Sequence, residues 1–179
     1  IVDEGITKVM FYSIDYADKT ENPQFRLVKI DTTSPSTGIF LSGTEGKDGW
    51  YVSDVTVSFS CPDSLSGCST TKYCIDTTNS CTPDNAYSSV FPVKDEGKRY
   101  IRYNSVDNAG NVETVQPKEI KIDKTEPATT ASATSPPGGA AYTFNTPTKN
   151  SVRVALSCSD AVSGCKEIRY CKDSSTCTP

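Results

Sequence analysis

Apolar and polar residues alternate along several segments with the period of two that a half-buried β-strand requires. Residues 55–61 read VTVSFSC and residues 152–158 read VRVALSC, so every second position is apolar or cysteine. Residues 101–105 and 9–13 alternate in the same way, and further strands are expected at 37–42, 70–76, 87–93 and 119–123. No window combines a 3.6-residue period with helix caps, so we expect negligible helix.

Two sequence patterns occur twice in the chain. A four-cysteine frame at residues 60–83 recurs at residues 157–179, 97 residues later and shortened by one residue before its last cysteine. Residues 3–31 align with residues 95–123 without a gap, at an offset of 92. The linkers KIDTTSP and KIDKTEP share this offset, so an insertion of five residues lies between Pro127 and Cys158, and SPPGGAA is its expected place.

These repeats divide the chain into three parts. Residues 1–31 are the late strands of one repeat, residues 32–123 are a complete repeat, and residues 124–179 are the early strands of a further repeat. Solenoid units have about 20 to 45 residues, whereas a unit of about 92 residues is the size of a small sandwich domain. About seven short strands in this length is immunoglobulin-like spacing. We therefore expect an all-β chain of tandem immunoglobulin-like β-sandwich repeats.

Composition excludes several classes of function. The chain has no histidine, which removes the commonest general base and most catalytic metal ligands, so we expect neither an enzyme nor a cofactor. The 18 basic and 22 acidic residues are scattered, which argues against nucleic acid as a partner. No run of 18 apolar residues occurs, so we expect no membrane insertion of this segment. Eight cysteines favour an oxidising, extracellular compartment.

The middle repeat carries a set of short motifs. They are a D-x-T-x-P linker at 31–35, Gly-Trp-Tyr at 49–51, Asp63 followed by Ser-Gly at 66–67, Thr-Lys-Tyr at 71–73, Glu-Gly at 96–97, and a segment at 103–113 that contains S-x-D-x-AGN-x-E. As a set they resemble the immunoglobulin-like repeats of bacterial and archaeal cell-surface proteins, including the leptospiral outer-membrane type. This resemblance implies a structural module of a surface filament, S-layer or stalk. The alternatives are an adhesin for a carbohydrate or protein ligand and an accessory domain of a larger secreted enzyme.

The cysteine frame has two chemical interpretations. Six residues separate Cys61 from Cys68 and Cys74 from Cys81, which is too many for a zinc knuckle, so disulfides are favoured. The position of Cys68 in the resembled repeats places it inward with Cys61, whereas Cys74 follows the inward-facing Tyr73 and should face out. We therefore expect the pairs Cys61–Cys68, Cys74–Cys81, Cys158–Cys165 and Cys171–Cys177, although each frame allows three connectivities.

An oxygen-rich turn at Asp107, Asn111 and Glu113 could bind calcium or could serve the backbone. Asp and Asn at the end of a strand usually accept hydrogen bonds from N–H groups about two residues further on. The turn also lacks the Asp residues at alternate positions that a calcium-binding loop requires. We therefore expect Asp107 to cap a tight turn in which Gly110 has a positive φ. Asp123 and its counterpart Asp31, at the repeat junctions, are further weak calcium candidates.

The nine tyrosines and one tryptophan could form a carbohydrate platform or could fill cores and interfaces. Tyr73, Tyr103 and Tyr170 fall on the buried phase of expected strands. Trp50 and Tyr51, where a loop enters a strand, are the remaining candidates for ligand contact.

The two incomplete parts together contain most strands of one repeat. We expect residues 1–31 to pack against residues 124–179 head to tail, either between neighbouring repeats of a longer array or between identical subunits.

Overall fold

The computed structural model describes residues 1–172 and 178, and within them the chain is all-β. The strands are β1 (Gly5–Phe11), β2 (Gln24–Ile30), β3 (Gly38–Ser42), β4 (Trp50–Tyr51), β5 (Val55–Ser60), β6 (Cys68–Asp76), β7 (Asn85–Ala86), β8 (Phe91–Val93), β9 (Gly97–Asp107), β10 (Gln116–Ile122), β11 (Ala128–Thr134) and β12 (Arg153–Ser159). None of the described residues forms a helix long and apolar enough to cross a membrane.

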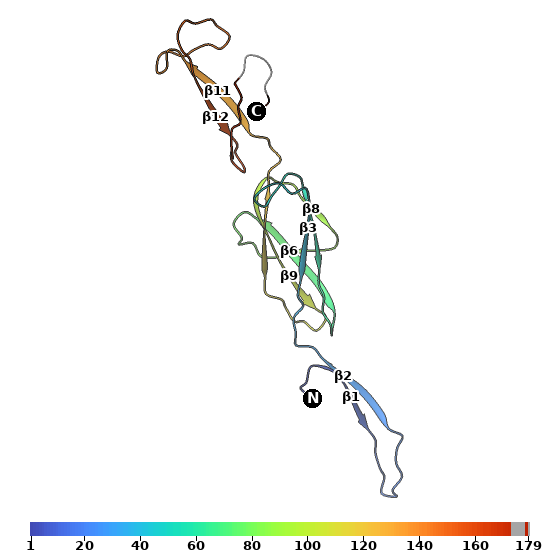
Figure 1. Cartoon of the computed structure of the whole chain (residues 1–179). Coiled ribbons are helices and arrows are strands. Elements are labelled where there is room, and N and C mark those ends of the chain that lie inside the picture. Colours follow the sequence, from blue (N-terminus) through green and yellow to red (C-terminus); the bar gives the residue numbers. More distant parts are fainter. Residues whose placement is uncertain (173–177, 179) are drawn as a thin grey trace.

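The strands form three bodies in a row (Figure 1). The N-terminal hairpin consists of β1 and β2, and the middle body contains β3 to β10. The C-terminal body contains β11, β12 and residues 160–172, which follow them and form no strand. The first and the third body lie at opposite ends of the row.

The middle body has two sheets that share one hydrophobic core. One sheet has the order β3-β5-β8 and the other the order β4-β10-β9-β6-β7; only β4 and β10 pair in parallel. Alternate residues of β5 and β9 point inward, so the apolar positions of the period-two pattern meet between the sheets. The core residues are Val55, Val57, Phe59, Val93, Ile101, Tyr103, Ile120 and Ile122.

The expectation of a single strand at 87–93 is wrong, because the structure has two short strands in this part of the chain, β7 and β8. β7 belongs to the five-stranded sheet and β8 to the three-stranded sheet, so the chain crosses between the sheets at residues 87–90. Tyr87 lies in this crossing and packs edge-on against Phe59, with 5.1 Å between the ring centroids. The hydrogen bonds between paired strands cannot continue where the chain changes sheet. The local alternation of apolar and polar residues does not reveal such a change.

The N-terminal hairpin and the β9–β10 hairpin pair in the same register. Gly5 lies opposite Ile30, and Gly97 lies opposite Ile122, 92 residues later. This correspondence continues through all seven pairs of β1 with β2.

The C-terminal body repeats the pairing of β3 with β5. Phe40 lies opposite Ser58 in the middle body. Ser132, 92 residues after Phe40, lies opposite Ala155, 97 residues after Ser58. The insertion therefore falls between β11 and β12, where SPPGGAA forms a turn closed by a bridge between Thr134 and Ala141.

Candidate functional site

A capped turn follows β9. One carboxylate oxygen of Asp107 accepts hydrogen bonds from the N–H groups of Ala109 (2.9 Å), Gly110 (2.7 Å) and Asn111 (2.8 Å), and the other accepts one from the Asn111 side chain (2.8 Å). Gly110 has a φ of +97°, which a residue with a side chain rarely adopts. Asp107, only 2% exposed, therefore serves the backbone as the turn interpretation expects.

Desolvation of Asp107 raises the pKa of its carboxyl, but the hydrogen bonds from Asn111, Gly110 and Ala109 outweigh it and hold the pKa below its usual value. The ionised form is therefore the one that fits this turn.

The N-terminal hairpin contains the same turn 92 residues earlier. Asp15 accepts hydrogen bonds from the N–H groups of Ala17 (2.8 Å) and Lys19 (2.9 Å). Asp18 occupies the place of Gly110 and keeps the positive φ, at +60°. Aspartate is one of the few residues with a side chain that tolerates this conformation.

Glu113 enters a buried polar network rather than an exposed turn. Its carboxylate accepts hydrogen bonds from the N–H groups of Thr37 (2.9 Å) and Ser105 (3.2 Å) and from the Thr37 hydroxyl. The Ser105 hydroxyl in turn forms hydrogen bonds with the hydroxyl groups of Thr37 and Thr71. Glu113 therefore ties the start of the middle body, just after the linker, to β9.

The first junction joins the N-terminal hairpin to the middle body. At the end of β2, Asp31 accepts hydrogen bonds from the N–H groups of Thr33 (3.1 Å) and Ser66 (2.9 Å), so it bridges the linker and a loop of the middle body. The Asn111 side chain donates to the Asp31 carbonyl oxygen (3.0 Å). Glu4 accepts from Thr32 N–H (3.1 Å) and the Thr33 hydroxyl (2.7 Å).

The second junction joins the middle body to the C-terminal body and repeats these contacts. Asp123 accepts hydrogen bonds from the N–H groups of Thr125 (3.0 Å) and Ser163 (3.0 Å). Glu96 accepts from Lys124 N–H (2.9 Å) and from the Thr125 hydroxyl. Every acceptor lies 92 residues after its counterpart at the first junction, and Ser163 lies 97 residues after Ser66.

Asp31 and Asp123, the two aspartates at the junctions, both have carboxyl groups with lowered pKa values. Ser66, together with the N–H group of Thr33, holds the pKa of Asp31 below its usual value against desolvation and the nearby Asp107. Ser163 and the N–H group of Thr125 lower the pKa of Asp123 in the same way.

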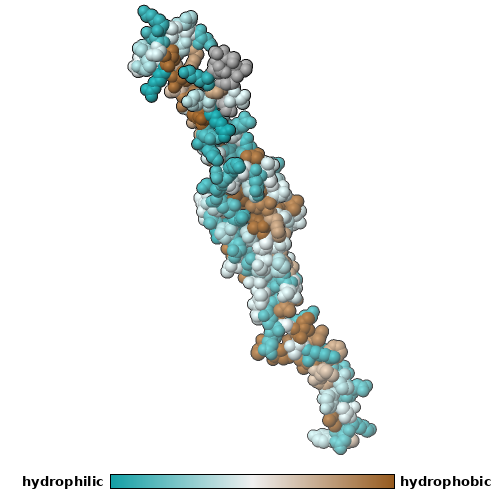
Figure 2. Space-filling view, in the orientation of Figure 1, coloured by the Kyte–Doolittle hydropathy of each residue, from teal (hydrophilic) through white to brown (hydrophobic). Residues whose placement is uncertain are grey.

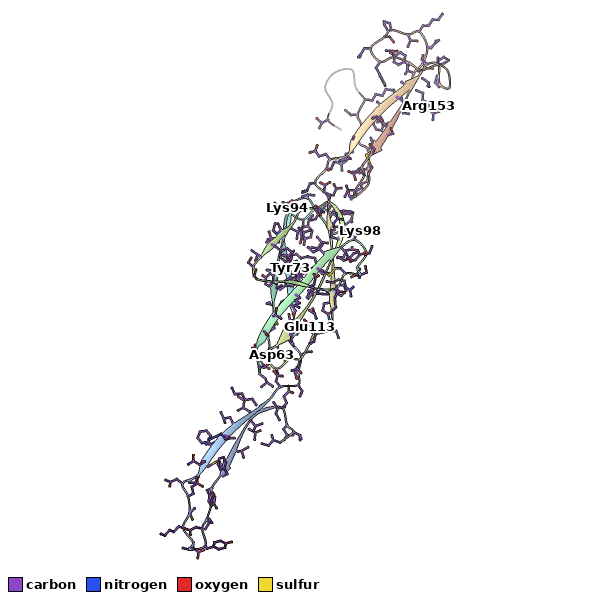
Figure 3. The ribbon with its side chains drawn as sticks, turned by 180° about the vertical axis from the view of Figure 1, so that it is seen from behind. Asp63, Tyr73, Lys94, Lys98, Glu113 and Arg153 are labelled. Atoms are coloured by element: carbon purple, nitrogen blue, oxygen red, sulfur yellow. A yellow bond between two sulfur atoms is a disulfide. The ribbon has the colours of Figure 1, made fainter. Side chains whose placement is uncertain are left out.

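Three carboxylates meet at the first junction. One oxygen each of Asp31, Asp63 and Asp107 lies within 4.8 Å of the others. Asp63 also accepts hydrogen bonds from the N–H groups of Leu65 (3.2 Å) and Gly67 (2.7 Å), so all three carboxylates serve the backbone. Figure 3 shows Asp63 at the end of the middle body that faces the N-terminal hairpin.

Of the calcium candidates from the sequence, Asp31 and Asp107 lie together at the first junction, and the others are placed elsewhere or serve as donors. Asp107 belongs to the carboxylate group, Asn111 donates from its side chain to Asp107 and Asp31, Glu113 points into the buried network, and Asp123 lies at the second junction. Sequence reasoning gave no role to Asp63, Ser66, Glu4 or Glu96. Their recurrence at matching offsets, in the D-x-x-SG loops and in the two Asp-Glu-Gly segments, was the signal that could have found them.

Acid should destabilise the middle body below about pH 4. Asp76 accepts hydrogen bonds from the N–H groups of Ser80, Cys81 and Asn79, which lower its pKa to about 2. Because the pKa of an unfolded Asp is about 3.9, its stabilising effect is complete above that pH and is lost as pH falls toward 2. We expect a melting temperature that is constant above about pH 5 and falls between about pH 4 and 2.

Replacing Asp76 with Asn should make this decline shallower, and melting curves of both proteins from neutral pH to pH 2 check it. A melting temperature that rises on acidification would contradict the assignment.

Disulfides join Cys61 to Cys68, Cys74 to Cys81 and Cys158 to Cys165, with Cα atoms 5.8 to 6.1 Å apart. These are pairs that the resemblance led us to expect. Cys171 is also disulfide-bonded, and its expected partner Cys177 lies outside the described residues. Cys74 follows Tyr73, which packs against the core, and Cys74 itself is only 5% exposed.

All eight cysteines should be oxidised in the isolated protein. The mass of the unreduced chain is then lower than that of the reduced chain by eight hydrogen atoms, one for each cysteine. Intact-mass spectrometry before and after reduction measures this difference, and a thiol that reacts with an alkylating reagent before reduction would contradict it.

The aromatic candidates separate in the structure. Tyr51 packs against the hydrophobic core, whereas Trp50 lines a cleft of about 340 Å³ at the second junction, together with Asp123, Ser163 and Lys166. The ammonium group of Lys121 lies 5.9 Å from the centroid of the Trp50 ring. Trp50 is therefore half-buried at a boundary between bodies.

No protein-family model and no curated protein matches the chain.

Proposed function

We propose that the chain is a structural module of an extracellular filament or array, such as an S-layer, stalk or appendage, built from tandem immunoglobulin-like repeats joined head to tail. The observation that carries this proposal is the repetition of one set of contacts at both junctions. Asp31 with Ser66, and Asp123 with Ser163, connect the end of one body to the same loop of the next.

These contacts make each linker a fixed connection. A free linker of this length would let neighbouring bodies move independently. Here two carboxylates of the body that precedes the linker accept N–H groups of the linker itself, Glu4 and Asp31 at the first junction and Glu96 and Asp123 at the second. Pro35, at the end of the first linker, is buried. Connections that share one set of contacts are what an array of constant spacing requires.

The chemistry of the carboxylates supports a structural role. Asp31, Asp76, Asp107 and Asp123 have lowered pKa values, and each accepts backbone N–H groups of a turn or a junction. Three short disulfide loops in the described residues are typical of proteins in oxidising compartments, which supports a place outside the cell.

Immunogold electron microscopy of intact producing cells tests this proposal. Antibodies raised against residues 32–123 should label surface structures in rows with constant spacing. As a control, cells whose surface has been digested with protease should lose the label. Labelling confined to the cell interior would contradict the proposal.

A further inference from the structure

A row of three side chains crosses the outer face of the five-stranded sheet in the middle body. Lys121 on β10 lies opposite Trp50 on β4 and opposite Lys98 on β9. The neighbouring residues Tyr51 and Ile122 pack in the core, so the row points away from it. Adjacent strands lie about 4.8 Å apart, so the row is about 10 Å long. Figure 3 shows Lys98 at the end of the middle body that faces the C-terminal body.

The row ends in the cleft at the second junction. Trp50 lines this cleft of about 340 Å³, together with Lys47 and Lys166. A volume of this size is within the range of ligand-binding pockets. The ammonium group of Lys121 lies 5.9 Å from the centroid of the Trp50 ring and donates a hydrogen bond to the Asp48 carbonyl oxygen (3.2 Å). A ligand that stacks on the Trp50 ring would therefore lie close to this ammonium group.

The charges around Trp50 leave ammonium groups available to a ligand. Of the four lysines in the row and the cleft, only Lys121 has an ion pair among the described residues, with Glu119 at 4.0 Å. The cleft also contains the carboxylates of Asp48 and Asp123. Asp123 already accepts two backbone N–H groups of the junction. The surface therefore favours a ligand that carries negative charge.

This surface is not part of the contacts that the repeats share. Pro147 stands 97 residues after Trp50, and Ile6 stands 92 residues before Lys98. The junction carboxylates and the serines that they bind, by contrast, recur at these offsets. Trp50 and Lys98 are therefore outside the repeated set of contacts and are free to serve a ligand.

We propose that this surface binds an acidic saccharide, a chain of pyranose rings that carry carboxylates, with one ring stacked on Trp50. The C–H bonds on the face of a pyranose carry small positive charges and pack against the electron-rich face of an indole ring. The carboxylate of the stacked ring would pair with Lys121, and that of a neighbouring ring would reach Lys98 along the row. This binding goes beyond the proposed structural function and does not depend on it.

The composition of the surface favours a saccharide over an acidic protein. Protein interfaces have an apolar centre and contain few lysines. Of the described residues that line the cleft, only Trp50 and Val52 have large apolar side chains. Figure 2 shows a largely hydrophilic surface where the middle and the C-terminal body meet. One aromatic ring surrounded by polar groups suits a sugar, which has hydroxyl groups around a small apolar face.

Isothermal titration calorimetry with the full chain tests the proposal. The probes are oligomers of galacturonate and of mannuronate, the methyl esters of both, and polyglutamate. At least one uronate oligomer should bind, about tenfold more tightly than its methyl ester, because the ester has the same rings without the charge. Polyglutamate has carboxylates without rings and should not bind detectably.

Two variants separate the contribution of the ring from that of the charges. Trp50→Ala should weaken binding of the uronate oligomer about tenfold, because it removes the stacking surface. Lys98→Ala with Lys121→Ala should lower the affinity for the uronate oligomer to that for its methyl ester. Both lysines lie outside the core, so this double variant tests the proposal even if Trp50→Ala does not fold.

Lys29→Ala is the matched control. Lys29 lies 92 residues before Lys121 on the equivalent strand, but its neighbour across the hairpin is Ile6. This variant should bind the uronate oligomer like the unmodified chain. Absence of binding by both uronate oligomers, equal binding of an oligomer and its ester, equal binding of polyglutamate, or an equal loss in Lys29→Ala would each overturn the proposal.

Discussion

Replacing Ile101 with Ala is expected to lower the free energy of unfolding of the middle body by about 3 kcal/mol, the range for truncating a fully buried aliphatic side chain. Ile101 is completely inaccessible between the two sheets. Its counterpart Val9 lies on a hairpin without a covering sheet, so Val9→Ala should leave the unfolding of the middle body unchanged. Urea unfolding of both variants, followed by the fluorescence of Trp50, measures the difference.

Trp50 is the single tryptophan and belongs to the middle body, so the signal reports on that body. The measurement is made at concentrations at which the chain is monomeric. Equal losses in the two variants would contradict the separation of the hairpin from the middle core.

Replacing Glu113 with Ala is expected to lower the free energy of unfolding by about 3 kcal/mol, because it leaves the buried N–H groups of Thr37 and Ser105 without an acceptor. Glu21, 92 residues earlier, is exposed and accepts one hydrogen bond from Ser13 N–H (3.2 Å). Glu21→Ala should therefore cost less than about 0.5 kcal/mol. Urea unfolding of the two variants provides the comparison.

The same pair of proteins tests the calcium interpretation. If Glu113 acted by binding calcium, EDTA would lower the melting temperature of the unmodified chain and leave that of Glu113→Ala unchanged. If Glu113 acts through the hydrogen-bond network instead, EDTA should leave the melting temperatures of both proteins unchanged.

Local pattern was sufficient for much of the fold. Alternation predicted β5, β9 and β12, and the offset of 92 located the hairpin that matches β9 and β10. The Asp107 cap and the positive φ of Gly110 also follow from local turn chemistry, since all donors lie within four residues of the acceptor.

What the sequence did not reveal depends on contacts between distant residues. The crossing between β7 and β8 depends on which sheet each strand joins, and the exposure of Tyr170 depends on the absence of covering strands in the C-terminal body. The meeting of Asp31 with Asp63 and Asp107 depends on how two bodies are joined. The crossing between the sheets and the exposure of Tyr170 leave no period or spacing in the chain, whereas the recurrence of the D-x-x-SG loop marks the residues that meet at the junctions.

Small-angle X-ray scattering from the dilute monomer tests most directly whether both junctions are fixed connections. The unmodified chain should scatter as one rigid rod of three bodies in a row, with the maximum dimension of the structure in Figure 1. The double variant Asp31→Ala with Asp123→Ala should scatter as flexibly linked bodies, because each junction loses the carboxylate that bonds the loop of the next body. An unmodified chain that already scatters as flexible beads, indistinguishable from the double variant, would contradict the account.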